Sequence, residues 1–170
     1  MWDLLVRNRG FLVSLGVILS IILFGVVGPR VVRDPHEMNR DQVGFPRIFE
    51  RPSSEFILGT DDYGHDVFAQ LAHGTKNSLK VGFITGSLVV LIAVIMGSLG
   101  AYKGGWADEI SMLVTNIAIV FPMLPLLIIL AAFLEQRSLY LVGFLIAIVA
   151  WPWAARAIRS QVLSLKERDF

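Results

Sequence analysis

The feature that most constrains this chain is the spacing of its charged residues. Four runs contain no Asp, Glu, Lys or Arg: 20 residues between Arg9 and Arg30, 22 between Lys80 and Lys103, 25 between Glu109 and Glu135, and 18 between Arg137 and Arg156. A helix needs ~20 apolar residues to cross a bilayer core, and a charge at the bilayer centre costs roughly 2.5–3.5 kcal/mol on insertion scales. The runs therefore predict transmembrane helices near 10–28, 81–101, 111–134 and 139–157.

Composition agrees with an all-α membrane protein. The chain is 55% hydrophobic and only 17% charged, so four buried helices in a soluble protein would have too little polar surface to cover them. A cleaved signal peptide is the alternative for the first run, but that run is long for a signal core and no small-x-small cleavage site follows it. The net charge of +1 gives no sign of nucleic-acid binding, and the absence of cysteine excludes thiolate metal ligands.

Basic residues at both ends of the chain predict its orientation. They are Arg7 and Arg9 before the first run, and Arg156, Arg159, Lys166 and Arg168 after the last. Basic flanks favour the cytoplasm, so both ends are expected there. The connection over residues 29–80 then lies outside; its seven basic and eight acidic residues nearly cancel. The loop Glu135–Ser138 is expected outside as well, and the loop Lys103–Glu109 inside.

The stretch LGTDDYGHDVFAQLAHGTKNSL precedes the second run and has the composition of a catalytic or metal-binding loop. Asp61 or Asp62 is expected to cap a short amphipathic helix, because a carboxylate accepts the free N–H groups at a helix start. Gly74 is expected to end that helix. On a helix His65 and His73 would lie ~12 Å apart, which is too far to share one metal ion. The pattern favours a solvated surface and no metal site.

Within the runs, prolines and small residues are the informative positions. Gly82 with Gly86, and Gly97 with its small neighbours, have the spacing that lets helices approach closely in lipid. Candidate pathway or hinge residues surround the prolines: Phe121, Pro122, Pro125, Trp151 and Pro152. The tryptophans suit interfacial anchors and a pathway lining equally. The sequence has no phosphate-binding loop and no nucleophile–base pair, which predicts a non-enzymatic protein without a cofactor.

Several ordered segments together resemble one family. They are LGTDDYGHDVFAQL, GTKNSLKVG, LGAYKGGWADE, the span containing FP, and RSQVLSLKERDF. Together they resemble the C-type permease subunits of dipeptide, oligopeptide and nickel ABC importers. The family motif on the outer side is matched by Leu58, Gly59, Thr60, Asp61, Gly64, Asp66 and Gly74. The chain departs from the pattern at His65, Gln70 and Lys76, where the family usually has arginine.

The resemblance implies the N-terminal part of an ABC type-1 permease fold in a bacterial or archaeal inner membrane. Residues 1–28 would hold the cytoplasmic N-terminus and first span, 29–75 the extracytoplasmic segment, and 76–170 the beginning of the type-1 domain. The implied partners are a second permease subunit forming a heterodimer, two cytoplasmic ATPase subunits and an external solute-binding protein. The implied approach to a coupling helix consists of Arg156, Arg159, Lys166, Glu167, Arg168 and Asp169.

The family pattern continues after such a segment with an EAA-type coupling helix and two further spans. Because the sequence stops at Phe170, it is expected to be a fragment or a shortened permease. Peptides are the expected substrate and nickel is the alternative. Two other hypotheses stay open: a structural or assembly membrane protein that does not transport, and a cation carrier that uses His36, His65 and His73.

Overall fold

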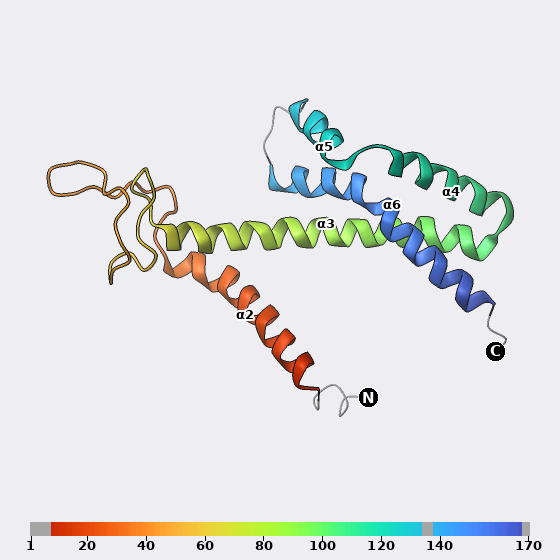
Figure 1. Cartoon of the computed structure of the whole chain (residues 1–170), viewed down its shortest axis with the longest axis horizontal. Coiled ribbons are helices and arrows are strands. Elements are labelled where there is room, and N and C mark those ends of the chain that lie inside the picture. The colour runs from red at the N-terminus through yellow and green to blue at the C-terminus, as the bar shows by residue number, and fades with distance from the viewer. Residues whose placement is uncertain (1–7, 134–137, 168–170) are drawn as a thin grey trace. The chain divides into compact units, whose positions relative to one another are not determined.

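The computed structural model describes residues 8–133 and 138–167, and its regular structure is helical (Figure 1). The helices are α2 (Arg9–Val31), α3 (Val67–Lys103), α4 (Gly105–Val120), α5 (Met123–Ala132) and α6 (Leu139–Lys166). Within the described residues no β-strand forms, and strand-like pairing is limited to isolated bridges between Arg40 and Pro46 and between Thr60 and Asp66. The all-α prediction is confirmed.

Helix length and hydropathy fit the predicted spans. Among the described residues, α2, α3 and α6 are long and apolar enough to cross a membrane, and α4 and α5 are so only as a pair, bent by 81° as in a broken span or a re-entrant loop. The break falls at Phe121 and Pro122, which are extended, because proline disfavours helical backbone in the residue before it and lacks an N–H. Pro125 lies in the first turn of α5, where no N–H is required.

The prediction of a separate short helix ending at Gly74 is wrong. Helix α3 continues for 37 residues from Val67 to Lys103 and passes through Gly74 without a break. A glycine in a helix interior loses only about 1 kcal/mol relative to alanine, which packing on either side of it can offset. The amphipathic turns and the second span are therefore one helix.

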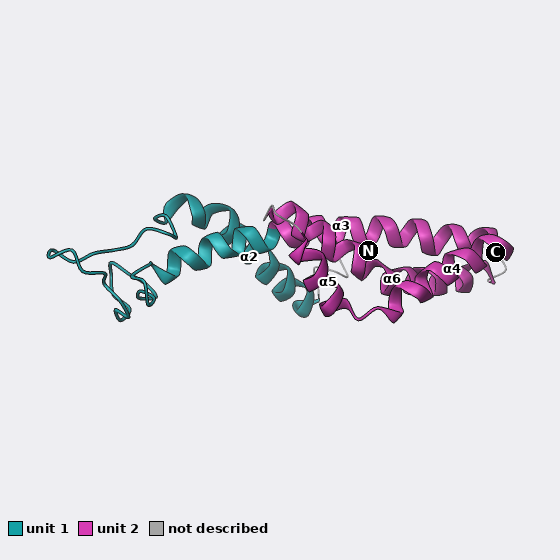
Figure 2. Cartoon of the chain, turned by 90° about the horizontal axis from the view of Figure 1, so that it is seen from above, with its two compact units in different colours: residues 1–79 teal, residues 80–170 magenta. Residues whose placement is uncertain are grey.

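The chain divides into two compact units, residues 1–79 and 80–170 (Figure 2). In unit 1, α2 packs on the first turns of α3 through small residues. A Cβ on Gly25 would lie 2.5 Å from Leu79 Cδ1, and one on Gly28 would lie 3.1 Å from Ala72 Cβ. In lipid there is no hydrophobic driving force between helices, so helices associate through close van der Waals packing, which small residues allow.

In unit 2 the remainder of α3 packs against α4 and α6. Ala93, Trp151 and Ala155 form its buried centre. A Cβ on Gly97 would lie 2.5 Å from the carbonyl oxygen of Ala155, so α3 and α6 touch backbone to backbone there. The expectation that the small residues around Gly97 serve helix packing is confirmed. Gly82 and Gly86 have no described atom near enough to contact an added Cβ.

Candidate functional site

The family motif before α3 forms a compact turn. Asp66 is 8% exposed, and its Oδ1 accepts the backbone N–H of Phe68 at 2.8 Å, so it caps α3. The prediction that Asp61 or Asp62 caps this helix is therefore wrong. The helix begins at Val67 because only Asp66 lies directly before the free N–H groups of the first turn.

Asp61 organises the loop instead of the helix. Its Oδ1 accepts the backbone N–H groups of Tyr63 at 2.9 Å and His65 at 2.8 Å, and its Oδ2 accepts Gln70 Nε2 at 2.7 Å. His65 Nδ1 lies 3.0 Å from the same Oδ2. Partial burial raises the pKa of Asp61, but the hydrogen bonds from His65, Tyr63 and Gln70 outweigh it and lower the pKa to about 2. The Asp61 carboxylate is ionised and both of its oxygens already accept hydrogen bonds, which suits a structural role better than general-base catalysis.

Two motif glycines are required by the backbone. Gly59 has φ +77°, and a Cβ there would lie 2.2 Å from the carbonyl oxygen of Glu50. Gly64 has φ +79°, and its Cβ would lie 3.0 Å from the carbonyl oxygen of Asn39. Left-handed backbone and close approach both exclude a side chain. Thr60 is buried between them, while Leu58 is 44% exposed.

A charged cluster behind the motif was missed by sequence reasoning. Arg47 Nε lies 2.6 Å from Glu50 Oε1, and Arg47 Nη1 lies 2.9 Å from Glu55 Oε2. The guanidinium stands 4.7 Å from the ring centroid of Phe56, which is fully buried. The hydrogen bonds that Arg47 donates to Glu50 and then to Glu55 raise the pKa of Arg47, and the bond from Arg47 lowers the pKa of Glu55. The only hint in the sequence is the spacing of three between Arg47 and Glu50, which is uninformative outside a helix.

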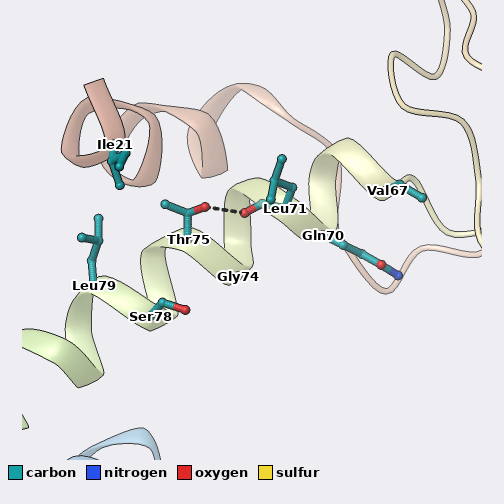
Figure 3. A pocket seen from close by; sticks show the side chains of 8 residues that line it. All are labelled: Ile21, Val67, Gln70, Leu71, Gly74, Thr75, Ser78 and Leu79. Carbon is teal, nitrogen blue, oxygen red and sulfur yellow. Dashed lines mark hydrogen bonds between the residues drawn. The ribbon is translucent and has the colours of Figure 1, made fainter. Parts of the chain in front are cut away.

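The three histidines do not form one cluster. His36 and His73 line one open cavity of about 410 Å³ with Asp34, Gln70 and Asn77, whereas His65 is bonded to Asp61 outside it. No group of three or more metal-ligating side chains occurs in residues 8–133 and 138–167. A second cavity, of about 620 Å³, lies between α2 and the first turns of α3 (Figure 3). It is mostly apolar, and Thr75 within it donates its hydroxyl to the carbonyl of Leu71 at 2.8 Å.

The predicted pathway or hinge residues lie in two different environments. Phe121 is 55% exposed and borders an apolar groove of about 450 Å³ at the bend between α4 and α5. The other lining residues are Val114, Ile117, Ala118, Leu126, Ile148 and Val149. Trp151 and Pro152 are buried within unit 2, whereas Trp153 is 67% exposed. Of these predicted residues, Phe121 borders the groove at the bend, whereas Trp151 and Pro152 do not line it.

Polar side chains of α6 bond to α4 and to the end of α3 in unit 2. Arg159 Nε and Nη2 donate to the two carboxylate oxygens of Asp108 at 2.7 and 2.5 Å. Arg156 Nη2 donates to Asn116 Oδ1 at 2.7 Å. Lys166 Nζ donates to the carbonyl of Tyr102 at 3.2 Å. Of the other residues predicted here, Glu167 ends α6, whereas Arg168 and Asp169 lie outside the described residues, as do Arg7 and residues 134–137.

Long apolar helices, one of them broken at a proline, define a polytopic α-helical membrane protein. Residues 89–170 are similar to the family described as "Binding-protein-dependent transport system inner membrane component". That description is of a membrane component of a transport system. Family and helices together place the chain in a membrane.

Three curated relatives match over nearly the whole chain. The dipeptide transport system permease protein DppC of Haemophilus influenzae is 32% identical over 99% of this chain and 58% of its own length. DppC of Bacillus subtilis is 31% identical over 99% and 51%, and the oligopeptide transport system permease protein OppC of Bacillus subtilis is 32% identical over 96% and 52%. The chain therefore spans about half the length of the curated relatives it matches.

Proposed function

We propose that this chain forms part of the membrane permease of an ATP-driven, binding-protein-dependent importer of dipeptides or oligopeptides. The observation that carries the proposal is the similarity to dipeptide and oligopeptide permeases over 96–99% of the chain. The broken span α4–α5 supports it, because discontinuous helices are tolerated in membranes where they line a cavity or pack against protein. The relatives' names favour peptide over nickel as the substrate.

In this proposal the energy comes from partners. Two cytoplasmic ATPase subunits would hydrolyse ATP, a second permease subunit would complete the pathway, and an external binding protein would deliver the peptide. The N-terminus would be cytoplasmic, with residues 29–75 on the outer side and residues 76–170 beginning the type-1 permease domain. The motif from Leu58 to Gly74 would then be an outer scaffold, because the Asp61 and Asp66 carboxylates are engaged in loop and capping bonds.

In the proposed importer, the groove at the bend would serve the transport pathway and the polar residues of α6 would serve coupling to the ATPases. The groove at Phe121 and Pro122 would border the pathway, because the bend exposes apolar surface in the middle of a span. The polar end of α6, including Arg156, Arg159 and Lys166, would lead toward the ATPase side. Trp151 and Pro152 would support the bend from within unit 2, since both are buried there.

Association with an ATPase pair tests the proposal against a structural or assembly protein that does not transport. The complex is purified from native membranes in mild detergent, and its ATP hydrolysis is measured with and without binding protein loaded with a dipeptide. The proposal predicts co-purified ATPases whose turnover rises when the loaded binding protein is added. A chain recovered without any ATPase, or with one that ignores the loaded binding protein, would overturn it.

A further inference from the structure

Two pairs of side chains join α4 to α6, one in the first turn of α4 and one in its second half. We name them together the α4–α6 clamp: Asp108 with Arg159, and Asn116 with Arg156. Asp108 and Asn116 are eight residues apart on α4, which is ~12 Å along a helix. Arg156 and Arg159 are only three residues apart on α6, so their side chains point in different directions along α4 to reach Asn116 and Asp108.

The clamp lies over a tightly packed backbone. The Asp108 and Arg159 side chains are only 20% and 29% exposed. Close by, a Cβ on Gly97 would lie 3.1 Å from the backbone nitrogen of Arg159. Ser111 Oγ donates to the carbonyl of Met96 at 2.5 Å, which ties α4 to α3 as well. Helix α4 therefore cannot slide along α6 without breaking directional bonds to Arg156 and Arg159.

The bend that follows α4 is held differently. The groove beside Phe121 is apolar, and Ile148 and Val149 of α6 line it. Apolar contacts are non-directional and can exchange with one another at little cost. Helix α4 is therefore fixed to α6 by oriented hydrogen bonds in its first turn and at Asn116, whereas the bend that follows it has apolar contacts that can repack.

We propose that the α4–α6 clamp makes α4 move together with the C-terminal half of α6, and that the bend at Pro122 absorbs this movement. Its members are positioning residues: they couple ATP hydrolysis by the partner subunits to opening at the bend. This proposal rests on the proposed importer function. Two distant sites of a protein are commonly coupled by rigid helices that connect packed elements with two alternative arrangements.

The decisive quantity is the number of ATP molecules hydrolysed per peptide imported, measured in the same proteoliposomes that hold the complete transporter. Asp108→Ala is expected to raise this ratio about 5-fold or more, the low end of typical coupling between two sites. The exchange Asp108→Arg with Arg159→Asp is expected to return the ratio to within about 2-fold of wild type, because it restores the ion pair. Glu109→Ala is the matched control, since Glu109 is the exposed neighbouring carboxylate and forms no ion pair with any described residue.

An unchanged ratio in Asp108→Ala, with normal amounts of inserted protein, would overturn the proposal. If Asp108→Ala fails to insert, Asn116→Ala replaces it, because that change removes a hydrogen bond between a charged and a neutral group and not an ion pair. An unchanged ratio in Asn116→Ala would then overturn the proposal equally. A wild-type transporter that imports no peptide would contradict the proposed function, whereas wild-type uptake with unaltered ratios in the variants would contradict the clamp alone.

A spectroscopic measurement tests the clamp without transport. The chain has no cysteine, so Leu113→Cys on α4 and Leu165→Cys on α6 provide the only two spin-label sites in it. Both side chains are more than half exposed, at 59% and 51%. The label-to-label distance distribution should be narrow in the otherwise wild-type chain and broader with Asp108→Ala. A distribution that stays narrow in that variant would show that the clamp does not hold α4 to α6.

Discussion

The segment over residues 32–66 and the α4–α6 clamp both depend on polar side chains, but for different reasons. The segment has no regular helix or strand, and its backbone shape is maintained by side chains such as Asp61 and Thr60 that bond to nearby backbone groups. In unit 2 the helices satisfy their own backbone, and polar side chains such as Arg156 and Arg159 join one helix to another. Local polar bonds thus define a loop, whereas long-range polar bonds fix the positions of elements that are already formed.

The two regions also use glycine differently. Gly59 is needed because its backbone is left-handed and another carbonyl approaches it closely. Gly97 is helical, and it is needed only because α6 lies against it. The first requirement belongs to a turn, and the second to a helix–helix contact. Substitutions at the two positions should therefore damage different parts of the molecule.

Gly97→Val should have the largest effect, because its Cβ would overlap backbone of α6 that cannot move independently. Overpacking of this kind destabilises by about 3 kcal/mol, and unit 2 should lose the contact between α3 and α6. The measurement is resistance to unfolding in detergent, with Gly86→Val as the control because open space surrounds Gly86. Equal losses in the two variants would show that the contact at Gly97 is not what holds unit 2 together.

Gly59→Ala should follow, at about 2 kcal/mol, because left-handed backbone and a clash with the Glu50 carbonyl act together. Hydrogen exchange should rise over residues 47–66 and remain unchanged in unit 2. Gly44→Ala, at φ +96° in open space, has the strain without the clash and should cost about 1 kcal/mol. If exchange rises in unit 2 as much as in the segment, the two regions do not respond independently.

The ionised Asp61 should make the segment sensitive to acid. Its pKa is lowered from 3.8 to about 2, so the stabilisation is present above about pH 4 and is lost as the pH falls toward 2. The full effect is about 2 kcal/mol. Asp61→Asn should be less stable at neutral pH and lack this pH dependence, with Asp62→Asn as the exposed control. Denaturant unfolding of the segment at pH 7 and pH 2.5 measures the difference, and full acid sensitivity retained in Asp61→Asn would refute the assignment.

Gly74→Ala should have the smallest effect and the opposite sign. Gly74 lies inside α3 with open space around it, so alanine should stabilise the helix by about 0.5–1 kcal/mol. A glycine that ended the helix in left-handed backbone would instead be destabilised by alanine. Thermal unfolding of the variant therefore distinguishes one continuous helix from two.

The spans could be predicted because the membrane imposes length and charge limits that any sequence must show. Pro122 was also predictable as a break, since proline lacks an N–H wherever it occurs. The cap at Asp66 was missed because three carboxylates precede the helix, and only the turn through Gly64 decides which one faces the free N–H groups. The partnership of Asp108 with Arg159 spans 51 residues, and no local pattern indicates it.

The most direct test of the central claim is ATP-driven uptake of a labelled dipeptide into proteoliposomes. They contain the permease with this chain, its partner permease and the ATPases, with binding protein on the side that faces outward in the cell. The account predicts uptake that requires ATP, requires binding protein, and is suppressed by excess unlabelled dipeptide but not by an equal concentration of Ni²⁺. Uptake that ignores ATP, or that unlabelled dipeptide fails to suppress while Ni²⁺ succeeds, would contradict the assignment as a peptide importer.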